Sequence, residues 1–296
     1  MSIQLNSKNN KINFKQFLNL EDISSEEILE VISTASELKS MRAVHENCTA
    51  LKNKYILLVT KPNLPRSSIT FQIAVKELGG EPVLISLTGE NLESLLSDEH
   101  YIKALSSCGV SAVLVCTSKR EDSNIFKNYV SVPVINATAI NSPSEALSTF
   151  MTIYEVTHTF KNLKITLVGN FNKEDNSLIT GLVKLGADVT ILPCENGEPS
   201  NSYIGYLSQY SDIKIIKDKK TALKNAEFVY FASGDNSLYI EKDDFSDNET
   251  YKVLSSVPSD KKLFNLNVIN GNSLIDKQTE NLLHIGKALL VLLVNK

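Results

Sequence analysis

The chain has 296 residues, of which 42% are hydrophobic and 22% are charged, and these proportions exclude a disordered, fibrous or collagen-like protein. Its formal net charge at pH 7 is −4 and no dense basic run occurs, so we expect neither a nucleic-acid partner nor an electrostatic contact with a membrane. At about 100–200 residues per domain, this length predicts two domains or one large one.

The cysteines and the N-terminal segment indicate the compartment. The four cysteines form no CxxC pair, so their spacing predicts neither a zinc site nor a disulfide framework, and free thiols suit a reducing cytosol. Residues 1–20 contain no apolar core of the kind found in signal peptides, and no window holds about 18 apolar residues in succession. We therefore expect a cytoplasmic protein that binds no metal ion and enters no membrane.

The first predicted elements are a capped helix and four strands. Ser24-Ser25-Glu26-Glu27 precedes an apolar stripe at 28–38, which predicts a capping box at the start of an amphipathic helix. Short apolar runs separated by helical patterns then predict strands at 55–60, 82–86, 112–116 and 132–136.

A second capping box opens the next helix. In Ser142-Pro143-Ser144-Glu145, a hydroxyl residue precedes a proline at the first helical position and a glutamate at the third. The pattern predicts a helix from Pro143 to about Phe160, which at about 1.5 Å per residue is long enough to join two domains.

The rest of the chain continues the alternation of strands and helices. The polar segment 233–248 predicts a mobile loop with room for a short helix, and the apolar segment 280–294 predicts a buried helix. Five further strands are predicted at 164–168, 188–192, 213–216, 227–231 and 262–266.

Continuous apolar strands that alternate with helices indicate parallel sheets covered on both faces. Nine strands, split four and five by one long helix, therefore predict an α/β fold of two doubly wound parallel-sheet domains rather than one barrel. The predicted domains are residues 1–146, with the C-terminal helix 277–296 packed back on them, and residues 147–276.

Four segments in this order resemble the aspartate/ornithine carbamoyltransferase family. The segment at 61–80 resembles the family's K-P-S-T-R-T-R-x-S-F loop and helix, and the segment at 132–155 its V-P-V-I-N…H-P-x-Q-A-L stretch. The segments at 17–39 and 277–293 resemble its first and last helices. The resemblance implies a carbamoyl-phosphate domain, an amino-acid domain, and transfer of a carbamoyl group to an amine without a metal or cofactor. It also implies a homotrimer with active sites at the subunit boundaries.

The loop that would bind phosphate departs from the family pattern. Leu64, Pro65, Arg66 and Ser67 stand where the family has Ser-Thr-Arg-Thr, and Ser68 falls on its second arginine. One interpretation is an anion site built from Arg66, Ser67, Ser68 and the N-terminus of a helix. The other is an ordinary surface turn with a solvated arginine, and the sequence favours neither.

Other motif positions have lost the groups that the resemblance implies. Ser142 and Glu145 replace the histidine and glutamine that contact the carbamoyl group, and helix capping is the favoured interpretation of both. Cys116 replaces an arginine at a strand end and is more typical of packing. Asn265 lies in the counterpart of the family's H-C-L-P motif and keeps a hydrogen-bond donor, whereas the amino-acid-binding S-M-G loop has no counterpart.

Further candidates favour no additional chemistry. Residues 169–172 lack the glycine spacing of a dinucleotide site, and Asp243, Asp244 and Asp247 lack the spacing of a calcium loop. The four histidines are interpreted as surface or packing residues: His45, His100, His158 and His284.

Two hypotheses about function remain. The leading one is a carbamoyltransferase-like protein whose site has eroded, which binds carbamoyl phosphate or another small anion and acts in binding or scaffolding. The alternative is an active carbamoyltransferase with an unusual amine or amino-acid acceptor. No cofactor is expected in either case.

Overall fold

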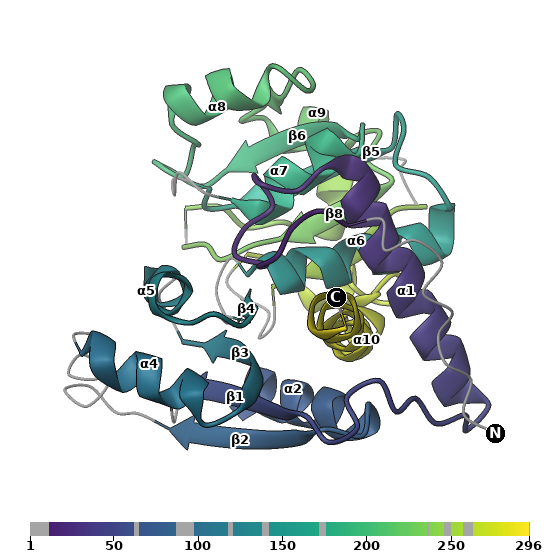
Figure 1. Cartoon of the computed structure of the whole chain (residues 1–296). Helices are drawn as coiled ribbons and strands as arrows, with labels where there is room; N and C mark the ends of the chain where they lie inside the picture. The colour runs from purple at the N-terminus through teal and green to yellow at the C-terminus, as the bar shows by residue number, and fades with distance from the viewer. Residues whose placement is uncertain are drawn as a thin grey trace. The chain divides into compact units, whose positions relative to one another are not determined.

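The computed structural model describes residues 12–61, 65–86, 98–117, 121–137, 142–171, 176–235, 237–245, 250–256 and 263–295 (Figure 1). The chain divides into two compact units, and its path crosses between them at 148/149 and again at 280/281. Each unit is built around one parallel sheet.

The first unit contains a four-stranded sheet in the order β2-β1-β3-β4, with parallel pairing throughout. Helix α2 packs on β1 and β2, α4 packs on β3, and α5 packs on β3 and β4. The elements are α1 (Ser25–Ala43), β1 (Tyr55–Thr60), α2 (Pro65–Glu77), β2 (Glu81–Ser86), α4 (Glu99–Ser107), β3 (Val110–Cys116), α5 (Glu121–Tyr129) and β4 (Val134–Asn136).

The capping box predicted at the start of α1 is confirmed. The Ser24 hydroxyl accepts a hydrogen bond from the Glu27 amide at 3.2 Å, and the Glu27 carboxylate accepts one from the Ser24 amide at 2.9 Å. The same carboxylate accepts a hydrogen bond from the Asn13 amide at 2.6 Å, which ties the preceding chain to the helix. These contacts lower the pKa of Glu27, although its partial burial acts in the opposite direction and is the largest single influence.

The second unit contains a five-stranded sheet in the order β7-β6-β5-β8-β9, again with parallel pairing, and Figure 1 shows β5, β6 and β8 at its centre. The two sheets confirm the prediction of two doubly wound α/β domains. The elements are β5 (Lys164–Gly169), α7 (Ser177–Lys184), β6 (Asp188–Pro193), α8 (Asn201–Leu207), β7 (Lys214–Ile215), α9 (Lys219–Leu223), β8 (Phe228–Phe231), the 3₁₀ helix η1 (Lys242–Phe245), β9 (Lys252–Ser255) and the 3₁₀ helix η2 (Leu266–Val268).

The ninth predicted strand was wrong. The fifth strand of the second sheet is β9, not the apolar run at 262–266. Within the described part of that run, Phe264 makes a single bridge to Ile240 and the chain then turns into η2. The run is apolar because Leu263 and Phe264 are buried, not because they extend a sheet.

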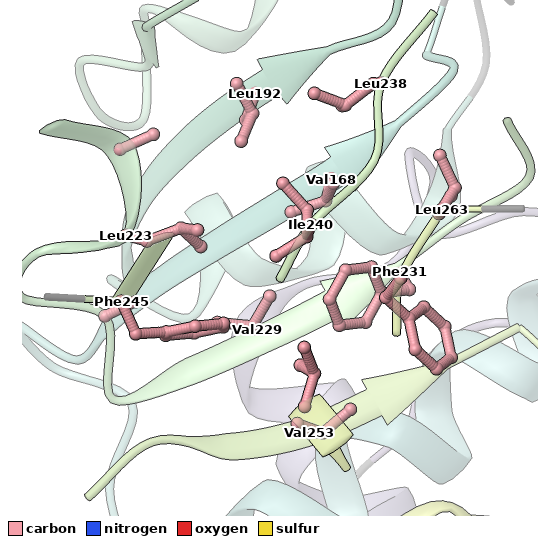
Figure 2. Close-up of a cluster of buried hydrophobic side chains, with 14 of the residues drawn as sticks. Val168, Leu192, Leu223, Val229, Phe231, Leu238, Ile240, Phe245, Val253 and Leu263 are labelled. Carbon is pink, nitrogen blue, oxygen red and sulfur yellow. The ribbon is translucent and has the colours of Figure 1, made fainter. Parts of the chain in front are cut away.

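The polar segment after β8 is a loop only in part. Leu238, Ile240 and Phe245 are buried among the side chains of the second sheet, and Figure 2 shows this cluster. The Phe245 ring stacks on Tyr251 with the two ring centroids 3.7 Å apart. The short helix for which the sequence left room is η1. Leu238, Ile240 and Phe245 therefore anchor the segment to the hydrophobic core of the second unit.

Two long helices contain the points at which the chain passes between the units. These are α6 (Pro143–Thr157) and α10 (Ile275–Val294). The C-terminal part of α10 contacts elements of the first unit, since the backbone carbonyl of Val294 accepts a hydrogen bond from Lys54 and Gly286 packs on the Phe71 ring. The assignment of the domains to carbamoyl phosphate and to an amino acid stays a prediction.

Candidate functional site

Ligands of open parallel sheets bind beyond the carboxyl ends of the strands, where the strand order reverses. In the first sheet this point lies between β1 and β3. Thr60 ends β1, and Cys116 and Thr117 lie at the end of β3, and all three are buried. The two threonines were not singled out from the sequence, although each directly follows an apolar run.

Cys116 presents a neutral group at this edge. Its side chain is 0% exposed, and burial raises the pKa of the thiol to about 12. A thiol with so high a pKa is neither an anion nor a nucleophile at neutral pH. Cys116 therefore contributes no positive charge at the carboxyl end of β3.

The predicted anion-binding residues lie at the start of helix α2, which follows the carboxyl end of β1 along the chain. Its first residue is Pro65, whose missing N–H suits the first helical position, and Arg66 and Ser67 follow in the first turn. The structure describes only the backbone of these three residues, and Leu64 lies outside the described residues. Ser68 is 7% exposed, and its hydroxyl accepts a hydrogen bond from the side-chain Nε2 of Gln72 at 3.0 Å.

The N-terminus of α6 is capped by a neighbouring side chain. The buried Ser142 hydroxyl accepts a hydrogen bond from the Ser144 amide at 3.2 Å, as a capping residue does. The Ser144 hydroxyl donates to the carbonyl of Asn136 at 3.0 Å, which fixes α6 to the end of β4. Glu145 lies half-buried in the first turn, where a negative charge complements the helix dipole.

In the second sheet the strand order reverses between β5 and β8. The chain leaves β5 through Gly169, whose φ of 130° is one that other residues rarely adopt, and the Asn170 amide then donates to the carbonyl of Ser233 at 2.8 Å. The backbone amide of Asn265 donates to the carbonyl of Ile240, and its side-chain oxygen accepts from the Asn267 amide at 3.0 Å. This side-chain oxygen therefore serves the turn into η2.

The segment after β8 carries a stable negative charge. Hydrogen bonds from the Ser237 side chain and backbone hold the pKa of the exposed Asp235 carboxyl below its usual value. An anionic carboxylate there repels the carboxylate of an amino acid.

The described part of the chain offers neither a cluster of metal ligands nor a membrane-spanning helix. No group of three or more His, Cys, Asp or Glu side chains there could hold a metal ion. None of its helices combines the length and the apolar character needed to cross a membrane. Of the histidines, His284 is completely buried in α10, as a packing residue.

Comparisons with known proteins agree with this architecture. Residues 15–155 match the family model for the aspartate/ornithine carbamoyltransferase, carbamoyl-P binding domain. An ornithine carbamoyltransferase from Bacillus thuringiensis subsp. konkukian is 27% identical in an alignment 308 positions long, which covers 95% of this chain and 95% of that one.

Solved structures show the same likeness. The ornithine carbamoyltransferase from Pyrococcus furiosus has a TM-score of 0.84 at 25% identity, and the match covers 95% of this chain and 97% of that one. The catalytic subunit of M. jannaschii aspartate transcarbamoylase has a TM-score of 0.82 at 18% identity, with 95% and 98% covered, which is a likeness of fold. The fold is that of a transcarbamylase. The family model, the curated relatives and the solved structures all support the aspartate/ornithine carbamoyltransferase family for this chain, as its motifs indicated.

Proposed function

We propose that this carbamoyltransferase-family protein binds carbamoyl phosphate or another small anion weakly and has lost standard transfer of the carbamoyl group to ornithine or aspartate. Its role is then that of a binding or scaffold protein. The observation that carries the proposal is the buried, neutral thiol of Cys116 at the carboxyl end of β3. The negative charge that develops on the leaving phosphate and on the carbamoyl oxygen needs preorganised hydrogen-bond donors. A buried thiol is a weak hydrogen-bond donor.

The two other departures reinforce this loss. The Ser142 hydroxyl is engaged in capping α6, and Glu145 brings a negative charge to the same helix terminus. A hydrogen bond to a charged group contributes about 1.5–3 kcal/mol, and about 1.4 kcal/mol corresponds to a factor of ten in rate. Three such losses slow the reaction by several orders of magnitude even where they are not additive.

The alternative is an active carbamoyltransferase with an unusual acceptor. It is favoured by the ornithine carbamoyltransferases that match over 95% of this chain. Assays with other amines as acceptors separate the two hypotheses, because an eroded site fails with ornithine, with aspartate and with every other amine. An active enzyme with a different amine fails with ornithine and aspartate too, yet consumes carbamoyl phosphate when that amine is supplied.

Arg66 is proposed as the cation of the remaining anion site, with Ser67 and Ser68 as hydroxyl donors at the N-terminus of α2. In Arg66→Ala, inorganic phosphate should no longer raise the urea midpoint of unfolding, while the stability without phosphate changes by less than about 0.5 kcal/mol. In Arg42→Ala, which removes the partly exposed ion pair between Arg42 of α1 and Glu77 of α2, phosphate should stabilise the protein as in the wild type. Equal stabilisation of the Arg66→Ala variant and the wild type would disprove the site.

We also propose that the protein forms a homotrimer. One supporting feature is strand β2, an edge strand on which Val83 and Leu84 point to opposite faces and are 40% and 47% exposed. The opposite edge of the same sheet, β4, is covered by hydrogen bonds with Phe17. An exposed apolar edge strand is a template for association. Sedimentation velocity at micromolar concentration should show a trimer, and a monomer would contradict the proposal.

A further inference from the structure

Lysines are concentrated at one edge of the second sheet. Residues 213–224 contain five lysines and a single carboxylate, that of Asp218, although the whole chain carries a net charge of −4. The lysines are not consecutive, since they are spread over β7, the connection that follows it and α9 with its C-cap. A local excess of positive charge in an acidic chain marks a surface suited to a partner of opposite charge.

Two of the five lysines are held by other groups. Lys217 forms an exposed ion pair with Glu198 at 2.7 Å. The Lys219 ammonium lies 3.8 Å from the Asp244 carboxylate of η1 and donates a hydrogen bond to the carbonyl of Tyr239. The remaining three are exposed and form no ion pair with the described residues, and we call them the lysine surface: Lys214, Lys220 and Lys224.

The lysine surface lies on one face of the sheet. Ile216 packs against the hydrophobic cluster that includes Leu223 of α9, so its side chain points to the face on which α9 lies. Lys214 is two residues earlier on the extended chain and therefore points to the same face. Lys220 and Lys224 are four residues apart on α9 and its C-cap, which places them next to each other on the helix surface.

The strand that carries Lys214 has a free edge. β7 pairs with β6 and is the outermost strand of the sheet as described. The Ile216 amide donates to the carbonyl of Ile191 in β6, so the amide of Ile215, one residue earlier, faces away from the sheet. The Ile215 side chain is 36% exposed. A free strand edge can accept an extended segment of another chain through backbone hydrogen bonds.

We propose that the lysine surface and the free edge of β7 together bind an extended acidic segment of another protein. The segment adds to the sheet as a strand beside β7, and its carboxylates pair with the three lysines. Like charges at the spacing of Lys220 and Lys224 repel each other, and carboxylates of the partner relieve that repulsion. The surface belongs to the second unit, so its test does not depend on the anion site proposed at Arg66 in the first.

An acidic peptide fits this surface better than a nucleic acid does. The second unit contains no arginine, which is the usual residue for bidentate recognition of phosphate groups. A nucleic acid also has no peptide backbone with which to extend the sheet. Lysines on an edge strand can instead protect it from pairing with a second copy, and that simpler role predicts no affinity for acidic peptides.

The test is fluorescence anisotropy with the full-length protein and a fluorescein-labelled decapeptide of alternating glutamate and threonine. We expect saturable binding to the wild type that weakens as salt is added. In the triple variant Lys214→Gln/Lys220→Gln/Lys224→Gln, the Kd should rise about tenfold, as for the loss of three exposed ion pairs.

A matched control separates this surface from the overall charge of the protein. It replaces three exposed lysines of the first unit and changes the net charge equally: Lys15→Gln/Lys52→Gln/Lys127→Gln. Its Kd should stay within about twofold of the wild type, because salt screens distant charges.

The free edge of β7 is tested separately. Ile215→Pro removes the N–H that faces away from the sheet, whereas Ile215→Ala shortens the side chain alone, and proline is tolerated where a strand N–H faces solvent. The Kd should rise more in Ile215→Pro than in Ile215→Ala. Equal values would overturn the addition of a strand.

Equal weakening in the two triple variants, or no binding by the wild type at millimolar peptide, would overturn the proposal. A single-stranded thymidine oligonucleotide that binds as tightly as the peptide would overturn the choice of partner. Self-association of the lysine-surface variant with an unchanged affinity for the peptide would show that the lysines only protect the edge. Should that variant fail to fold, Lys220→Gln decides: a Kd raised about twofold supports the proposal, and an unchanged Kd overturns it.

Discussion

With carbamoyl phosphate and either ornithine or aspartate at millimolar concentrations, the protein should form no citrulline or carbamoyl-aspartate above background. The proposal rests on three groups that supply no strong donor: the buried thiol of Cys116, the capping hydroxyl of Ser142 and the carboxylate of Glu145. We expect a deficit of at least about a thousandfold against a working enzyme, from the loss of three charge-assisted contacts.

The ornithine carbamoyltransferase of Pyrococcus furiosus, the structural relative with a TM-score of 0.84, is a suitable positive control in the same assay. Turnover of this protein near about 1 s⁻¹, within the ordinary range of enzymes, would contradict the eroded site. Such a result would favour the alternative hypothesis, an active carbamoyltransferase.

Acid should destabilise the protein through His284 before most carboxylates are protonated. The side chain is completely buried, and burial, followed by the charges of Lys287, Lys39 and Arg42, lowers the pKa of His284 to about 4. The nearby Glu77 carboxylate, which bonds to Lys287 at 2.9 Å, opposes this shift only in part.

The sign of the effect follows from proton linkage. Between pH 6.5 and about 4 the unfolded chain binds a proton at His284 that the folded chain does not, so the free energy of unfolding falls as the pH falls. A full shift of this size corresponds to roughly 3 kcal/mol over that window. The pKa of Glu77 is also lowered in the folded protein, and the stability it contributes is lost at still lower pH, below its unfolded value of about 4.5.

Urea unfolding at a series of pH values checks this prediction. In His284→Gln, which removes the titrating group, the dependence of the unfolding free energy on pH between 6.5 and 4.5 should be clearly flatter than in the wild type. The control His100→Gln changes a histidine whose side chain is 87% exposed and should leave the slope unchanged. Equal slopes in the wild type and in His284→Gln would show that folding does not lower the pKa of His284.

Local signals predicted most of the fold. Ser24 and Glu27 cap each other's backbone amides and are only three residues apart, so the start of α1 could be predicted without tertiary information. Ser142 was likewise predicted to cap α6, and its hydroxyl accepts from the Ser144 amide. Strand β9 was missed because its apolar signal is only Val253 and Leu254 between polar neighbours.

Tertiary contacts explain what the sequence could not predict. The run at 262–266 was taken for a strand because apolar residues report burial, and Leu263 and Phe264 are buried against the segment around Ile240. The pKa of His284 is lowered mainly by burial, and also by the charges of Lys39 and Arg42, which are more than 240 residues away in the chain. For Arg66 and Ser67 the sequence remains the source of the proposed anion site, since the structure adds only that they open α2.

Binding of carbamoyl phosphate to the wild-type protein tests the central claim most directly, since the claim is that an anion site outlasted the transfer chemistry. Urea unfolding at constant temperature, with and without carbamoyl phosphate, measures this binding because any ligand selective for the folded state raises the midpoint. We expect a stabilisation of about 1.4 kcal/mol once the ligand reaches about ten times its Kd, reduced by added salt as for a partly exposed anion site. An unchanged midpoint at every concentration of carbamoyl phosphate would contradict the account.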